Sequence, residues 1–233
     1  EFKDIKEFVD KMYAQIEAAQ ELLYKPSSSE PKEWTELHYL LNESGLRKAS
    51  QGLENAKRLM PYVFAFNHKI KEVRMVCGLD EEKYDITFSR AGEETERVAG
   101  YLVVKTSVGI TGQDPCDVYC LCSDDRTKQI VIPPTVFTDA QKTPSLFLFY
   151  PLLGTENFGT NFIFHSSVFT AKEERDGIML PSGNENAKEK YEKNVAILNE
   201  MVDMLLDFLK NNEDERFSMG DNESLARVYF PRS

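Results

Sequence analysis

Residues 145–180, SLFLFYPLLGTENFGTNFIFHSSVFTAKEERDGIML, constrain the fold of this chain more than any other segment. Residues 146–150 are all apolar, which is typical of a strand that is buried on both faces. Residues 161–169 show the alternation of a second strand, in which successive side chains point to opposite faces. Residues 172–177 (KEERDG) are charged and have no apolar pattern. The segment therefore predicts two strands of a sheet that deliver one short charged loop.

Apolar residues recur at helical spacing at both ends of the chain. They predict one helix that begins at Phe2 and another over residues 187–211. Ser44 is the predicted N-cap of a third helix, residues 45–60, and Pro61 is its predicted stop signal.

The middle of the chain is rich in short strand-like runs. The predicted strands cover residues 36–41, 62–76, 84–89, 97–108, 118–122 and 129–132. A Gly- and Glu-rich turn is expected between the third and fourth of these runs, and residues 123–126 (SDDR) have the composition of a hairpin turn. Helices at both ends around a mixed or antiparallel sheet give the α+β class.

Three parts are expected along the chain: an N-terminal helix and linker over residues 1–33, an α+β domain over residues 34–211, and an acidic tail over residues 212–233. The domain ends in a long amphipathic helix. Residue 1 is Glu rather than Met, and an apolar helical stripe begins at Phe2. We therefore expect the chain to be a piece of a longer protein.

The composition of the chain limits which classes of partner it is expected to bind. No apolar run approaches the roughly 18 residues of a membrane-spanning helix, so no membrane association is expected. The net charge of −11 argues against direct nucleic-acid binding, since phosphate contacts need a basic face. The amphipathic, acidic N-terminus is neither a signal nor a transit peptide, and the cysteine usage suits a cytoplasmic protein.

The cysteines and histidines do not suggest a metal site. The chain contains Cys77, Cys116, Cys120 and Cys122, and His38, His68 and His165. Cys120 and Cys122 share one strand face with Val118, while Tyr119 and Leu121 take the other. We expect reduced, buried cysteines that behave as small hydrophobes, and no zinc site, because the histidines are scattered.

Known catalytic and phosphate-binding motifs are missing. Ser166 and Ser167 follow His165, but the direct neighbour Ser166 points to the opposite face of the strand, and there is no G-x-S-x-G elbow. Neither a G-x-x-x-x-G-K-[ST] nor a G-x-G-x-x-G motif occurs.

Lys172 and Arg175 remain as candidate site residues. One interpretation is an ordinary solvated, charged turn. The other is an anion site, in which lysine offers a point charge and arginine a planar fork for phosphate oxygens. Asp176 is then expected to orient Arg175, and Gly177 to allow a sharp backbone turn.

The same residues resemble a known family. FYPLLG, NFIFHSSVF and KEERDG are similar to the strand–strand–basic-loop segment that follows the ATPase domain in sacsin-like proteins of the GHKL superfamily. That superfamily also contains the ninety-kilodalton heat-shock chaperones, MutL and gyrase B. The upstream pieces EWTELHYLL and PYVFAFNHKIKEV extend the resemblance over residues 34–180. His165-Ser166-Ser167 departs from the family pattern, which has Asn-Gly before the basic loop.

The resemblance implies a middle, or transducer, domain with the ribosomal-protein-S-five domain-two-like fold. It implies that ATP and Mg²⁺ are bound by a preceding ATPase domain, and that a basic residue reaches the γ-phosphate when the domains close. Arg175 is the best match for that residue and Lys172 the second. No Asp-x-Gly occurs in this sequence, so this piece alone is expected to hold no cofactor and to be inactive. A chaperone-like client and a second copy of the chain are further implied partners.

A second hypothesis assumes the same fold but gives the chain no role with a nucleotide. The acidic composition and the lack of a complete catalytic set also fit a non-catalytic protein–protein interaction module.

Overall fold

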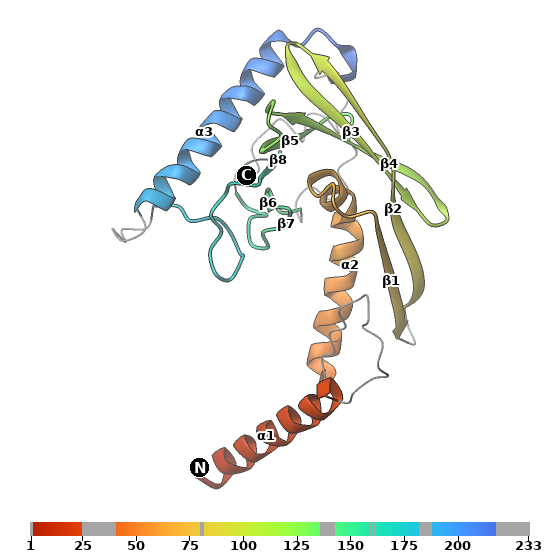
Figure 1. Ribbon diagram of the computed structural model, residues 1–233, viewed down its shortest axis with the longest axis vertical. Helices are drawn as coiled ribbons and strands as arrows, with labels where there is room; N and C mark the ends of the chain where they lie inside the picture. Colours follow the sequence, from red (N-terminus) through yellow and green to blue (C-terminus); the bar gives the residue numbers. More distant parts are fainter. Residues whose placement is uncertain are drawn as a thin grey trace. The chain divides into compact units, whose positions relative to one another are not determined.

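The computed structural model describes residues 2–24, 41–79, 82–135, 143–158, 160, 162–181 and 188–217 (Figure 1). The chain divides into two compact units, Glu1–Gly45 and Leu46–Ser233. The described residues form three α-helices, eight strands and one short 3-10 helix, Glu215–Phe217. The predicted α+β class with a mixed sheet is confirmed.

The first unit contains α1, Phe2–Tyr24, which confirms the helix predicted from Phe2. Most of its apolar stripe is exposed where its side chains are described, with Phe8 69% and Ile16 43% exposed, whereas Val9 is half-buried. The predicted strand over residues 36–41 lies outside the described residues except for Leu41, which is in no strand.

Helix α2, Glu43–Phe66, corrects two predictions. Asn42, not Ser44, is the N-cap, because its Oδ1 accepts a hydrogen bond from the Gly45 amide at 2.8 Å. The helix also continues through Pro61. A proline inside a helix costs about 3 kcal/mol, but the turns around it bury four large side chains, each worth roughly 1.5–3 kcal/mol. These are Tyr62, Val63, Phe64 and Phe66.

The sheet has the strand order β1-β2-β3-β4-β5-β8-β6-β7. The strands are β1 (Glu72–Leu79), β2 (Glu82–Val98), β3 (Tyr101–Ile110), β4 (Gln113–Cys122), β5 (Lys128–Ile132), β6 (Leu146–Leu148), β7 (Tyr150–Pro151) and β8 (Ile163–Ser166). Neighbours are antiparallel except β6 and β8, which are parallel. Strands β1 to β4 form the long meander seen in Figure 1. The strand predicted over residues 62–76 begins only at Glu72, because α2 occupies its first part.

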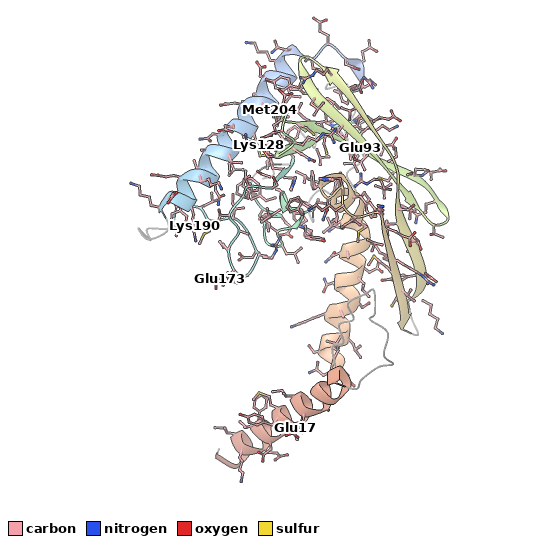
Figure 2. The ribbon with its side chains drawn as sticks, in the orientation of Figure 1. Glu17, Glu93, Lys128, Glu173, Lys190 and Met204 are labelled. Atoms are coloured by element: carbon pink, nitrogen blue, oxygen red, sulfur yellow. The ribbon has the colours of Figure 1, made fainter. Side chains whose placement is uncertain are left out.

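The turn predicted between residues 89 and 97 is wrong, because β2 runs through it with one bulge beside Arg90. Its acidic residues are matched by cations from other segments. Glu93, labelled in Figure 2, lies 2.8 Å from Arg126, and Glu96 lies 2.9 Å from Arg216. The real turn is Ala99-Gly100, where φ is 49° and 83°. The hairpin predicted around residues 123–126 is confirmed.

Two helices cover opposite faces of the central strands. Val118, Cys120 and Cys122 pack with residues of α2, whereas Leu121 and Ile130 pack with residues of α3 (Lys188–Asn211). The predicted alternation of β4 is therefore confirmed, as is the helix predicted at the end of the domain. All four cysteines are free, and three are buried.

Within the described part of the chain, no helix is long and apolar enough to cross a membrane. The domain boundaries expected near residues 33 and 211 stay predictions.

Candidate functional site

The two strands before the charged loop are shorter than predicted. Strand β6 ends at Leu148, and Phe149 has a left-handed backbone with a φ of 61°. Leu146 and Phe147 are fully buried, as predicted, but Tyr150 is 50% exposed. The chain therefore reverses sharply at the end of a buried strand.

Strand β8 is buried on both faces. Phe162 and Phe164 belong to the core beneath α3, and Ile163 to the core beneath α2. The predicted alternation is therefore confirmed at Phe162, Ile163 and Phe164, but Phe169, which it places on the face of Ile163, belongs to the core beneath α3. The strand covers only Ile163–Ser166 of the predicted residues 161–169, because Ser167 and Val168 form a turn.

The charged loop, residues 172–177 and hereafter the KEERDG loop, is closed by backbone hydrogen bonds. The Lys172 amide donates to Gly177 O at 3.0 Å, and the Arg175 amide donates to Lys172 O at 3.1 Å. Ala171 and Ile178 form a bridge at its base. The backbone of the loop is thus folded even though its charged side chains are exposed.

A neighbouring turn braces the far side of the loop. Gly154 has a φ of 107°, and a Cβ at this position would lie 2.9 Å from Asp176 O. Only glycine fits both the backbone conformation and the contact. Thr155 ties the same turn to β6, since its Oγ1 accepts from the Leu146 amide at 3.1 Å and donates to Leu152 O at 2.8 Å.

Arg175 takes the sharp turn that the sequence predicts for Gly177. Its φ is 54°, and a left-handed backbone is uncommon for any residue other than glycine. Its Nη2 donates to Leu148 O at 3.2 Å. Within the described part of the chain, the guanidinium makes no other hydrogen bond or ion pair.

Lys172 is already paired. Its Nζ lies 3.4 Å from Asp176, which therefore does not orient Arg175 as predicted. Both side chains are about half exposed, and such surface pairs contribute only about 0–1 kcal/mol. Glu173, at the outer end of the loop in Figure 2, and Glu174 are exposed carboxylates that any bound anion must avoid.

His165, which the sequence treats as one of three scattered histidines, contacts the same turn. Its Nδ1 accepts a hydrogen bond from the Phe149 amide at 3.3 Å and lies 3.2 Å from Phe147 O. It is 1% exposed, and burial lowers its pKa to about 4. The imidazole is therefore neutral at pH 7. The position of His165 beside Phe147 in the parallel β6–β8 pair is a tertiary property that no sequence motif signals.

Of two pockets, neither is lined by the KEERDG loop, although one reaches His165. One of about 640 Å³ is lined partly by Phe66, Phe149 and His165, and one of about 750 Å³ lies between α2, β2 and β4. Neither Lys172 nor Arg175 lines either pocket. Arg175 is exposed and lies outside both of these pockets.

Among the described residues, no three His, Cys, Asp or Glu side chains are grouped so that they could hold a metal ion. The KEERDG loop, its Gly154 brace and the buried His165 together define the candidate site. Comparison of the chain with protein-family models, curated proteins and solved structures finds no match.

Proposed function

We propose that the chain is the middle, transducer-like region of a sacsin-like GHKL ATPase. In this proposal it has the ribosomal-protein-S-five domain-two-like fold, and a preceding domain binds ATP and Mg²⁺. Arg175, assisted by Lys172, contacts the γ-phosphate and couples hydrolysis to a change in domain arrangement. The resemblance of residues 34–180 supports the family, and the α+β class agrees with it.

The presentation of Arg175 is the observation that carries this proposal. A non-glycine residue in a left-handed conformation costs roughly 1–3 kcal/mol and persists only where the surrounding structure fixes it. Here the loop hydrogen bonds and the Gly154 contact fix it. The guanidinium is held through one nitrogen, so its remaining N–H groups can bind phosphate oxygens in the paired geometry that arginine favours.

The chemical role follows from charge. A cation that reaches the γ-phosphate stabilises the negative charge that is redistributed during phosphoryl transfer. Because Arg175 lies on an exposed loop, it can make that contact only after the domains close. The contact is lost when the γ-phosphate leaves, which makes closure depend on ATP.

The test measures ATP turnover by the full polypeptide that carries this chain with its ATP-binding domain. Arg175→Gly is the matched variant, since glycine adopts a φ of 54° without strain. We expect it to lower kcat about 10²-fold or more with near-normal nucleotide affinity, and Lys172→Ala to have a smaller effect. Lys190→Ala, which removes an exposed charge from α3 (Figure 2), is the control. Unchanged turnover in Arg175→Gly would refute the proposed contact.

One observation favours the alternative, a non-catalytic protein–protein interaction module. Ile5, Phe8 and Ile16 of α1 are exposed apolar side chains on one helix. In that case the full polypeptide has no Arg175-dependent turnover, and Phe8→Glu weakens association with a partner protein in analytical ultracentrifugation.

A further inference from the structure

Two side chains of the candidate site hold one peptide group. The peptide bond between Leu148 and Phe149 accepts a hydrogen bond at its oxygen from Arg175 Nη2, at 3.2 Å. Its N–H group donates to His165 Nδ1, at 3.3 Å. The position of this peptide therefore depends on His165 and in turn sets where Arg175 can lie.

This peptide is part of a strained turn. Phe149 has a φ of 61°, which is a clear outlier for a bulky side chain. The turn is closed on one side by the Leu152 amide, which donates to Leu146 O at 3.0 Å. The hydrogen bond to His165 holds Phe149 from the other side and opposes relaxation of its backbone.

The ring of His165 is itself fixed. It stacks on Phe66 with the ring centroids 4.7 Å apart and contacts Phe149 with the centroids 5.2 Å apart. Phe66 is the last residue of α2, so the stack fixes the imidazole against a helix of the scaffold.

The tautomer of His165 decides which backbone group it binds. A neutral imidazole with its proton on Nε2 accepts from the Phe149 amide through Nδ1. A proton on Nδ1 would instead be donated to Phe147 O, at 3.2 Å, and Phe149 would lose this acceptor. Both arrangements fit a neutral ring, and they have opposite consequences for the turn.

We propose that His165, as the Nε2-protonated tautomer, is a positioning residue that fixes the Leu148–Phe149 peptide and through it the guanidinium of Arg175. The role of His165 in placing Arg175 is argued from the hydrogen bonds of the Leu148–Phe149 peptide. The expected effect of His165 on ATP turnover rests on the proposed function.

The first test uses NMR on the 233-residue chain. The ¹⁵N shifts of the His165 ring report the tautomer in the wild type, so this readout does not depend on a variant that folds. We expect Nδ1 to be unprotonated. A protonated Nδ1 overturns the proposal.

Two variants then separate the hydrogen bond from the packing. His165→Phe keeps a ring against Phe66 but has no acceptor, and His165→Asn offers an amide oxygen close to the position of Nδ1. In His165→Phe we expect amide exchange at Phe149 to rise roughly tenfold, the side chain of Arg175 to become mobile, and the amides of β3 and β4 to keep their protection. His165→Asn should restore most of the protection. Unchanged protection at Phe149 and unchanged order at Arg175 in His165→Phe would overturn the proposal.

Turnover by the full polypeptide distinguishes this inference from the proposed function. If both hold, His165→Phe lowers kcat with little change in nucleotide affinity, and His165→Asn restores it. If the NMR effects occur but Arg175→Gly leaves turnover unchanged, the positioning role stands and the proposed function fails. If Arg175→Gly lowers turnover while His165→Phe changes neither kcat nor the order of Arg175, the positioning role alone fails.

Discussion

Single residues with unusual backbone conformations define the candidate site. Phe149 and Arg175 both have left-handed backbones, and a hydrogen bond from Arg175 to the residue before Phe149 joins them. Such conformations are costly, and here they occur together at the surface end of a buried strand. Neighbouring groups that hold this geometry should therefore be sensitive to small changes.

Gly154→Ala tests the brace of the KEERDG loop. The added Cβ would lie 2.9 Å from Asp176 O at a backbone φ of 107°. We expect the free energy of unfolding to fall by roughly 1–3 kcal/mol, from strain and displacement of the loop. Gly52→Ala is the control, because nothing lies within 4 Å of its Cβ in α2 and alanine favours a helix by roughly 0.5–1 kcal/mol. Urea denaturation measures both, and equal effects would contradict the close contact.

The titration of His165 should appear in the pH dependence of stability. Its pKa in the folded chain is about 4, below its ordinary value of 6.5, because burial disfavours the charged ring. Between these values the unfolded chain binds more protons, so the stability present above pH 6.5 is lost as the pH falls towards 4, in total by about 3 kcal/mol. His165→Phe should lack this loss, whereas the carboxylates titrate in both proteins. Parallel stability curves from pH 7 to 4.5 would refute the assignment.

At the scale of elements, similar apolar stripes have different environments. Phe8 of α1 is exposed, whereas Met201 and Phe208 of α3 are fully buried in the core. Met201 of α3 is fully buried, so Met201→Ala should cost about 2–5 kcal/mol. Ile16→Ala in α1 should change the free energy of unfolding of the chain by less than about 0.5 kcal/mol. Thermal denaturation of both variants checks this, and a large effect of Ile16→Ala would indicate that α1 is buried in solution.

The elements that the sequence predicted correctly are those that depend on local pattern. Periodicity identified α1, α3 and the β4–β5 hairpin, because each depends on local pattern and turn chemistry. It failed where distant contacts decide the outcome. Pro61 stays inside α2 because the residues around it are buried, and the acidic part of β2 stays a strand because it pairs residue by residue with β3.

At the scale of the whole molecule, the sequence predicted which segment carries the candidate site but not the contacts that form the site. The charge pattern located the KEERDG loop, but the left-handed Arg175, the Gly154 contact and the role of His165 arise from chain reversals that no local pattern encodes. The sequence assigned the sharp turn and the orienting partner to Gly177 and Asp176, which have other roles in the folded chain.

The 233-residue chain is expected to have no ATPase activity by itself. Arg175 is exposed and lines neither pocket, and the sequence has no motif that cradles phosphates. The purified 233-residue chain should therefore release no phosphate from ATP above background. Adding the separately purified ATP-binding domain should produce turnover that depends on Arg175, because the guanidinium then meets the γ-phosphate across the domain interface. Arg175→Gly should remove that increase and Lys190→Ala should not. Robust turnover by the chain alone would show that it contains a complete nucleotide site and that Arg175 is not a residue supplied across domains.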